Sequence, residues 1–275
     1  VASFPASSAA VAGYLSDLAV SGCSASTVRV AASALRWHHS EGARATGAGD
    51  LADPTAAAEV REVLAGLARE IGKVKRVRRA RPAMPTDLRA MVAANAGDGL
   101  LALRDRAVLL LGFTGAFRRS ELVALDLADL EEAEEGLRVT VRRSKADQLA
   151  RGAVVGIPRG EGPMCPVVAL RAWLAAAGAV EGPVFRVVRG GKATDERMSG
   201  RAVARMMKRL AVSVGADPAR FSGHSLRRGL ATAAAESGAD VLAIQKQGRW
   251  ASADMPARYA SEANVFKVNA ARGLL

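Results

Sequence analysis

The stretch KVKRVRRAR, residues 73–81, divides this chain. Six of its nine residues are basic, and they are Lys73, Lys75, Arg76, Arg78, Arg79 and Arg81. Pro82 and Pro85 follow, and a proline disfavours helical backbone in the residue before it. The pattern predicts an extended basic linker over residues 73–85. It separates a domain of residues 1–72 from one of residues 86–275, a division that 275 residues can support.

Both parts are predicted to be mainly helical, because the chain is rich in alanine and leucine, which are strong helix formers, while only 4% of it is aromatic. Segments 7–22, 24–42 and 53–70 show helical spacing of apolar residues or helix-capping signals. Asp53 is the expected N-cap of the third segment, with Pro54 at its first helical position. Residues 1–72 therefore read as a small helical bundle.

In the second part, helices are expected over residues 86–96, 99–116 and 119–127, and again after residue 165. Segments 137–144 and 153–159 read as the two strands of an antiparallel hairpin joined by a loop over 145–152. Residues 182–188 could add a third strand. The acidic patch of residues 131–135 reads as a solvated turn, and the glycine-rich stretch 189–200 reads as a mobile surface loop.

The net charge of +12 favours a polyanionic partner such as nucleic acid. The alternative is a basic surface that serves solubility. The linker poses the same choice, because a cationic segment can lie along a phosphate backbone or can be a solvated connector. In both cases we favour contact with DNA.

Several function classes find no support in the sequence. No apolar run reaches the roughly 20 residues that a membrane-spanning helix needs. Cys23 and Cys165 are isolated, which argues against a disulfide framework, and with three scattered histidines they make no zinc pattern. No glycine-rich phosphate loop of the ATPase or dinucleotide type is present. These features are typical of a cytoplasmic protein, and only a magnesium site built from carboxylates is left open.

Four segments carry residue types that suit phosphate chemistry. TGAFRRSEL, residues 114–122, places Arg118 three residues before Glu121, so that the two can pair on one face of a helix. SGHSLRRG, residues 222–229, repeats this spacing with His224 and Arg227 at an expected helix start. Taken singly, each residue has an ordinary structural reading.

The other two segments complete the pattern. Lys145 lies at the tip of the expected hairpin, and Tyr259 follows Trp250 by nine residues. Alone, Lys145 is a solvated loop lysine and Tyr259 is packing material. It is their order along the chain, after the two arginine segments, that points to one site.

In this order the segments resemble the tyrosine recombinases, or phage integrase family. TGAFRRSEL is similar to the first arginine box of the family, and FSGHSLRRG to its His-x-x-Arg box, particularly in the branch of Cre recombinase. QGRW, followed nine residues on by tyrosine, is similar to the third box and nucleophile. The resemblance implies a mainly α fold, with an N-terminal helical core-binding bundle and an α-rich catalytic domain that holds a small antiparallel β-sheet. Residues 1–72 match the core-binding domain in size and place only.

The resemblance also implies the chemical roles. Tyr259 would attack a DNA phosphorus and leave a 3′-phosphotyrosine and a free 5′-hydroxyl. Arg118 and Arg227 would clamp the phosphorane, because their paired donors do not deprotonate. Lys145 would be the general acid and Glu121 a support, while His224 would donate to a phosphate oxygen or assist the tyrosine proton. No metal and no cofactor are expected, because the covalent link preserves the free energy of the phosphodiester.

Two residues depart from the family pattern. Trp250 stands where most members have histidine, and its indole N–H can donate a hydrogen bond but cannot shuttle a proton. The Cre branch is similar in this respect. Arg249 occupies a position where small residues are common, and an additional phosphate contact is the one role that the sequence offers for it.

The implied function is a site-specific DNA recombinase that binds double-stranded DNA at a specific recombination site and exchanges strands through a Holliday junction. Two protomers would occupy each site and four would form the synapse, in a cytoplasmic, nucleoid-associated protein without a membrane. Residues 261–275 could dock on a neighbouring protomer, which we favour, or fold back on their own domain. The alternatives are a type IB topoisomerase-like nicking-closing enzyme and a non-catalytic DNA-binding accessory protein.

Overall fold

The computed structural model describes residues 6–46, 53–74, 80–142 and 152–263. Its contacts divide the chain into two compact units, residues 1–78 and 79–275. The boundary falls inside the segment that the sequence predicts as a linker, but the predicted extended backbone is wrong at both ends, because Lys73 and Val74 end α3 and Pro85 begins α4. Four basic residues of that segment, Lys75, Arg76, Arg78 and Arg79, and the tail after Ala263 lie outside the described residues.

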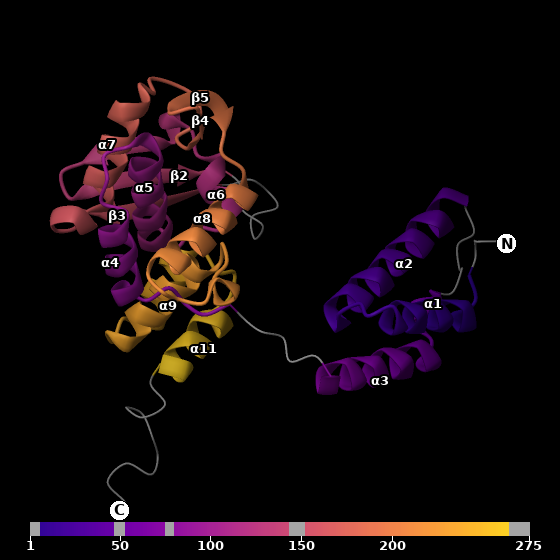
Figure 1. Ribbon diagram of the computed structural model, residues 1–275. Coiled ribbons are helices and arrows are strands. Elements are labelled where there is room, and N and C mark those ends of the chain that lie inside the picture. The colour runs from indigo at the N-terminus through magenta and orange to yellow at the C-terminus, as the bar shows by residue number, and fades with distance from the viewer. Residues whose placement is uncertain (1–5, 47–52, 75–79, 143–151, 264–275) are drawn as a thin grey trace, which may run out of the picture. The chain divides into compact units, whose positions relative to one another are not determined.

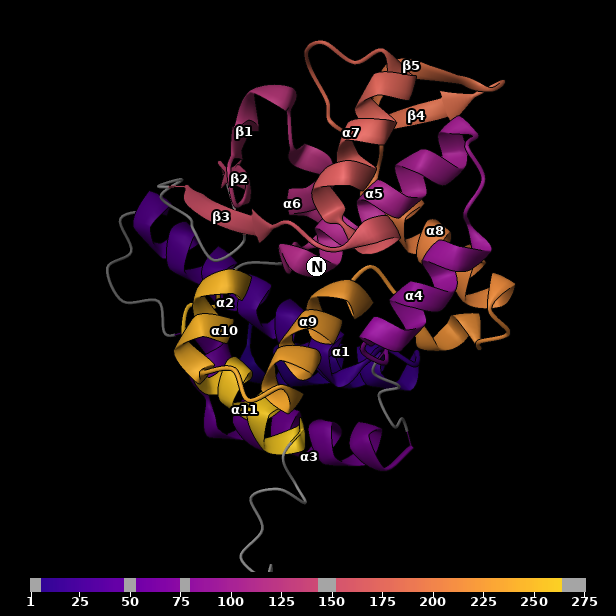
Figure 2. The ribbon, with the colours of Figure 1, turned by 90° about the vertical axis from the view of Figure 1, so that its left-hand side faces the viewer.

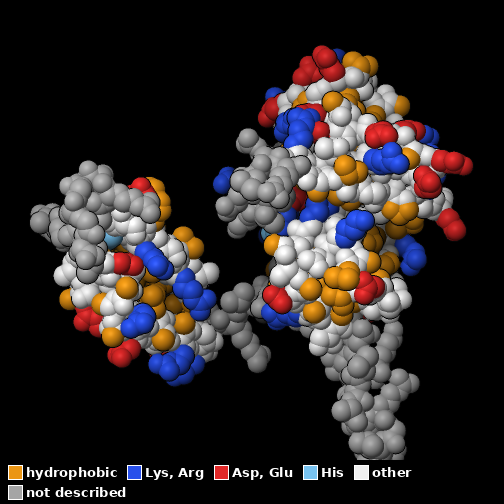
Figure 3. Space-filling model, turned by 180° about the vertical axis from the view of Figure 1, so that it is seen from behind, with side chains coloured by type: hydrophobic (Ala, Val, Ile, Leu, Met, Phe, Trp, Pro, Cys, Tyr) orange, Lys and Arg blue, Asp and Glu red, His pale blue; other side chains and the backbone are white. Residues whose placement is uncertain are grey.

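The first unit consists of helices α1 (Ser8–Val20), α2 (Ala25–Thr46) and α3 (Ala58–Val74), with a short 3-10 turn over Pro54–Ala56. Its core is small, because it is built around Val11, Leu15, Val28, Ala32 and Val60. Asp53 accepts a hydrogen bond from the Thr55 amide at 2.9 Å, so it caps the 3-10 turn, and α3 begins only at Ala58. Basic and hydrophobic side chains are mixed on the face of this unit that Figure 3 displays.

The helices of the second unit follow the sequence-based expectation with shorter bounds. They are α4 (Pro85–Ala94), α5 (Leu100–Thr114), α6 (Arg119–Ala124), α7 (Pro166–Ala177), α8 (Gly200–Ser213), α9 (Ser225–Glu236), α10 (Val241–Gly248) and α11 (Asp254–Ala263), with 3-10 turns over Leu127–Asp129, Gly162–Met164 and Pro218–Arg220. Helix α5 is buried over most of its length at the centre of this unit, beneath α7 (Figure 1). The mainly α fold class is confirmed, and within the described residues its sheets are small and antiparallel.

The first sheet has three strands in the order β1 (Leu130–Ala133), β2 (Gly136–Val141) and β3 (Ala153–Pro158). The predicted hairpin of β2 and β3 forms, with Val139 opposite Val155. The solvated turn predicted for the acidic patch is wrong for Glu131 and Glu132, which lie in β1, because that strand extends the β2 edge. Glu134 and Glu135 do form the turn.

The second sheet corrects two expectations. Strand β4 (Arg186–Arg189) pairs with β5 (Lys192–Arg197) rather than with the β2–β3 hairpin. The predicted mobile loop of residues 189–200 is therefore wrong. Gly190 and Gly191 both have positive φ, at 56° and 74°, and this backbone makes a tight two-residue hairpin turn. Since β5 is mostly polar, its sequence lacks the apolar alternation that would have announced a strand.

Helices α9, α10 and α11 gather side by side at one end of the second unit, opposite the β4–β5 hairpin (Figure 2). Gly229 of α9 allows the segment before α4 to approach this helix closely, because a Cβ there would lie 2.0 Å from the carbonyl oxygen of Ala83. The Ala83 amide in turn donates to the Ser225 carbonyl at 2.9 Å. The segment before α4 is thereby fixed against the start of α9. Among the described residues, no helix is long and apolar enough to cross a bilayer.

Candidate active site

A sharp turn after α5 forms the base of the candidate site. Ala116 has a φ of 46°, and Gly115 before it could not carry a Cβ, since that atom would lie 2.1 Å from the ring of Phe117. Positive φ costs a non-glycine residue roughly 1–2 kcal/mol. The turn is maintained because the Ala116 carbonyl accepts two hydrogen bonds, from Arg227 Nη1 at 2.7 Å and from Arg249 Nη2 at 3.3 Å.

Arg118 and Glu121 pair as expected, but they do so as a helix cap. Helix α6 begins at Arg119, so Arg118 is its N-cap with extended backbone. Glu121 accepts from the Arg118 amide at 3.0 Å and from the Arg118 guanidinium at 2.5 Å. The carboxylate therefore holds both the backbone and the side chain of Arg118, which fixes the guanidinium more firmly than a pairing across one helix face.

Glu121 is a buried carboxylate that stays charged. Burial by itself would raise its pKa, but the charge of Arg249 and the hydrogen bonds from Arg118 and Arg249 outweigh that effect and lower the pKa below its ordinary value. Arg249 Nη2 lies 2.8 Å from Glu121 Oε2. The ionised carboxylate thus joins two guanidinium groups that would otherwise repel each other.

Arg227 reaches the same place from α9. Its side chain is buried, and its Cζ lies 4.1 Å from the ring centroid of Trp250, a cation–π distance. One of its terminal nitrogens, Nη1, donates to the Ala116 carbonyl. The other, Nη2, is buried without a hydrogen-bond partner among the described residues. A buried unpaired donor is costly, and an anionic ligand that contacted this nitrogen would remove that cost.

The charge on Arg227 is disfavoured by its surroundings. Burial, followed by repulsion from Arg118 and Arg249, lowers the pKa of Arg227 to about 9, although Glu121 and Tyr259 act in the opposite direction. The group is still protonated at neutral pH. An arriving anion would relieve the repulsion and would raise this pKa again.

Tyr259 lies one aromatic ring away from Arg227. Its ring centroid is 6.0 Å from that of Trp250, with the two rings tilted by 54°. Trp250 itself folds back over Gly248, where a Cβ would lie 1.7 Å from the indole. The tyrosine side chain is 7% exposed and packs in a separate small cluster with Ala231, Ala235 and Ile244. Helix α11 thus holds the phenol at the site by contacts with small residues.

His224 and Tyr259 line one cavity of about 420 Å³, together with Ser222, Arg228 and Arg258. His224 is the N-cap of α9 and is exposed, whereas Arg227 three residues later is buried. The two residues of the predicted i, i+3 pair therefore differ, because His224 lines the cavity and is exposed, whereas Arg227 is buried and is not among the residues that line it.

Several predicted site residues come together in this way, and others do not. Arg118 contacts Glu121, and Trp250 contacts both Arg227 and Tyr259. His224 shares the cavity with Tyr259. Lys145 falls in residues 143–151, outside the described residues. Of the predicted linker contacts that the structure describes, Lys73 pairs with Glu70 at 2.7 Å, and Arg81 pairs with Asp87 and covers the ring of Phe221. Over the described parts of the chain, no group of three His, Cys, Asp or Glu side chains could hold a metal ion.

Sequence reasoning missed the part that Arg249 plays. Its side chain is turned inward rather than offered to a phosphate, and its two terminal nitrogens bond to the carbonyls of Gly115, Ala116 and Gln247 and to Glu121. Its backbone is left-handed, with a φ of 55°. The only signal in the sequence was an arginine at a place where small residues are common.

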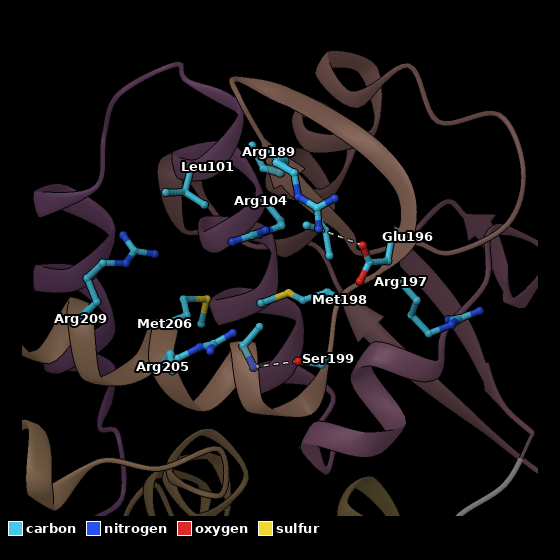
Figure 4. Close-up of a pocket in the computed structure, with 13 residues that line it drawn as sticks. Leu101, Arg104, Arg189, Glu196, Arg197, Met198, Ser199, Arg205, Met206 and Arg209 are labelled. Carbon is cyan, nitrogen blue, oxygen red and sulfur yellow. Dashed lines mark hydrogen bonds and ion pairs between the residues drawn. The ribbon is translucent and has the colours of Figure 1, made fainter.

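A larger pocket of about 570 Å³ lies elsewhere, between α5, α8 and the β4–β5 hairpin (Figure 4). Five arginines line it, and four have acidic partners: Arg104 and Arg209 with Asp105, Arg189 with Glu196, and Arg197 with Asp126. Arg205, the fifth, is exposed, so the described residues of this pocket include no buried unpaired donor like the one at Arg227.

The sequence model of the phage integrase family matches residues 85–264 of this chain. An integrase/recombinase xerD homolog of Selenomonas ruminantium is 36% identical over 272 residues, which cover 98% of this chain and 78% of that protein. The chain belongs to the phage integrase family of tyrosine recombinases. It is a site-specific recombinase, and the topoisomerase-like and non-catalytic alternatives are not favoured.

Other relatives of this integrase-family chain match over shorter lengths. The tyrosine recombinase XerC of Pelotomaculum thermopropionicum is 30% identical over 53% of this chain and 45% of its own length. Solved structures share the fold: XerH bound to palindromic difH substrate has a TM-score of 0.60 at 13% identity, over 96% of this chain and 73% of its own. The Tn1549 transposon integrase with transposon right end DNA has a TM-score of 0.62 at 16% identity, over 96% and 86%. Placement within the Cre branch stays a prediction.

Proposed function

We propose that this recombinase cleaves and rejoins duplex DNA through a 3′-phosphotyrosine on Tyr259. The phenol oxygen attacks the phosphorus, the bond from phosphorus to the 5′-oxygen breaks, and a free 5′-hydroxyl leaves. Arg118 and Arg227 neutralise the phosphorane, and Glu121 holds Arg118 in place. Rejoining is the same exchange in reverse, so the phosphodiester is conserved.

The observation that carries this proposal is the buried, unpartnered Nη2 of Arg227, one indole ring from Tyr259. A phosphate oxygen would satisfy this nitrogen and would relieve the repulsion among the three guanidinium groups. Donors that are fixed before the reaction are worth more at a transition state than donors that must reorganise. The cation–π contact with Trp250 fixes Arg227 in this way.

The remaining roles concern protons. His224, which is exposed and lines the cavity, donates to a phosphate oxygen or receives the proton of Tyr259. Trp250 supplies an N–H and packing but cannot move a proton. Lys145 protonates the leaving 5′-oxygen. A tyrosine needs such assistance, because its ordinary pKa is near 10.

The partner is double-stranded DNA that carries a specific recombination site. Residues 1–72 act as the core-binding domain, and the basic segment 73–85 lies along the phosphate backbone. Two protomers occupy each site, and four exchange strands through a Holliday junction. The net charge of +12 supports the DNA partner, and sedimentation of complexes with one and with two sites would measure both stoichiometries.

A library of nicked DNA duplexes with randomised sequence tests the cleavage reaction and identifies the target DNA sequence in one experiment. Wild-type protein should form a complex with DNA that survives denaturation, and sequencing of the captured strands should yield one motif. Peptide mass spectrometry should place the nucleotide on Tyr259, and the released 5′ end should accept a phosphate from a kinase without prior phosphatase treatment. A 5′-linked adduct, or no adduct, would contradict the proposal.

Neutralising the linker should weaken binding in a salt-dependent manner. We expect glutamine at the five positions Lys73, Lys75, Arg76, Arg78 and Arg79 to flatten the plot of log affinity against log salt. Each lost phosphate contact removes about 0.9 from its slope. Titration of the captured DNA at several salt concentrations measures the effect. Glutamine at Arg138 and Arg171, which pair with Glu131 and Glu132, should leave the slope unchanged. An unaltered slope in the linker variant would make the segment a tether.

A further inference from the structure

Arg249 has an unusual backbone. It ends α10 in the left-handed conformation, a position that favours glycine. Within the described residues, the non-glycine residues with positive φ are Ala116 and Arg249, and the two are hydrogen-bonded to each other. Strained backbone persists only where surrounding contacts impose it, and it concentrates at functional sites.

The side chain of Arg249 supplies those contacts. Its Nη1 donates to the carbonyls of Gly115 at 3.0 Å and Gln247 at 2.8 Å, while its Nη2 donates to Ala116 and to Glu121. The guanidinium also lies 5.0 Å from the ring centroid of Phe117. The side chain is 8% exposed, and both terminal nitrogens are bonded within the protein. The third nitrogen, Nε, is buried without a hydrogen-bond partner among the described residues.

Two of these acceptors are shared with the proposed phosphate clamps. Glu121 binds both Arg249 and Arg118, and the Ala116 carbonyl binds both Arg249 and Arg227. Arg249 is thus the one side chain among the described residues that touches the supports of both clamps. Its neighbour in sequence, Trp250, covers Arg227 and contacts Tyr259.

We propose that Arg249 is a positioning residue. It fixes the distance between Arg118 and Arg227 through their shared acceptors, and through its neighbour Trp250 it connects both arginines to the segment that carries Tyr259. The inference rests on the proposed function of those residues. Loss of Arg249 leaves Glu121 with a single cation and the Ala116 carbonyl with a single donor. The support of each clamp then loses one of its two partners, and the turn at Ala116 loses a bond that offsets its strain.

The test compares Arg249→Gly with Arg249→Ala and Arg249→Lys. Glycine suits the left-handed backbone, so Arg249→Gly removes the side chain without backbone cost. We expect its single-turnover rate of adduct formation to fall on the order of 10- to 100-fold, with unchanged affinity for DNA. Millimolar guanidinium should restore part of the rate, whereas urea, which has the same planar shape without the charge, should not. Arg171→Ala, which removes a surface arginine from α7, is the matched control and should behave as wild type.

Arg249→Lys separates positioning from folding. One ammonium group cannot serve three carbonyls and a carboxylate in the geometry of a guanidinium, so this variant should fold and still cleave slowly. Even if Arg249→Gly proved unstable, wild-type cleavage by Arg249→Lys or Arg249→Ala would overturn the inference. Wild-type cleavage by Arg249→Gly would do the same.

A second readout does not depend on cleavage. The charged groups around Glu121 are Arg118 in its own turn, Arg249 at the end of α10 and Arg227 on α9. Removing the charge of Arg249 leaves burial less opposed, so the pKa of Glu121 should rise in Arg249→Gly. Carbon NMR of the free protein measures this pKa, and the acidic limb of the rate profile should move to higher pH with it. An unchanged pKa overturns the inference, whereas absence of adduct in the wild-type protein counts only against the proposed function.

Discussion

The Tyr259→Phe protein should form no covalent complex with DNA and should still bind its site with wild-type affinity. The change removes one oxygen, and the ring keeps its place beside Trp250 at a centroid distance of 6.0 Å. Without that oxygen no ester to phosphorus can form, so capture should fall to background. Denaturing gels with the nicked substrate measure capture, and gel shifts measure binding.

The chain provides its own control for this experiment. Tyr14, the other of its two tyrosines, lies on α1 with 48% of its surface exposed. Tyr14→Phe should capture DNA as the wild-type protein does. Residual capture by Tyr259→Phe would reveal a different nucleophile, and equal loss in both variants would point away from chemistry and toward handling of the protein.

Removing Arg227 should slow cleavage by a factor on the order of 100 to 1,000, which is the usual effect of losing one preorganised donor at a transition state. The Arg227→Ala protein loses the buried, unpartnered Nη2 that is proposed to bind a phosphate oxygen. Single-turnover cleavage at saturating protein measures the rate constant for the chemical step. A rate within a few-fold of wild type would remove Arg227 from the mechanism.

Thermal unfolding provides a second test of whether the role of Arg227 is catalytic or structural. Burial disfavours the charge of Arg227, which offsets part of the loss of its hydrogen bond to Ala116, so Arg227→Ala should lose less stability than the removal of a buried arginine with an acidic partner. Arg104 offers the contrast, because its guanidinium binds the fully buried Asp105 and the Arg186 carbonyl. We expect Arg104→Ala to lose stability and to leave the cleavage rate of the folded protein unchanged. If Arg227→Ala proved the less stable of the two, its role would be structural.

The sequence predicts the fold well where the signals are local. Glycines and caps mark the helices, and strand-like segments mark the β2–β3 hairpin. The prediction fails at β5, because this strand forms by pairing with β4 across the Gly190–Gly191 turn, whereas its own composition does not indicate a strand. Helix bounds are less certain at α6, where Arg118 is a cap because Glu121 binds its amide.

For the site, residue type and order predict Arg118, Glu121, Arg227, Trp250 and Tyr259, and their catalytic roles stay predictions. Residue type and order cannot reveal the support beneath these residues. The acceptor for Arg227 is a backbone carbonyl 111 positions earlier, and Arg249 joins Glu121 across 128 positions. Such contacts depend on tertiary packing and on the left-handed backbone of Ala116 and Arg249. A single sequence reveals neither the packing nor this backbone conformation.

The net charge of the buried arginine cluster also affects how strongly it would bind the phosphodiester and the phosphorane. Arg118, Arg227 and Arg249 carry three positive charges, and Glu121 removes one, so an excess of two remains. A phosphodiester brings one negative charge and would leave the excess half cancelled. A phosphorane formed by phenolate attack carries two and would cancel it fully. In the proposed mechanism these four side chains are therefore neutralised more fully by the phosphorane than by the bound phosphodiester, and such a difference in affinity accelerates a reaction.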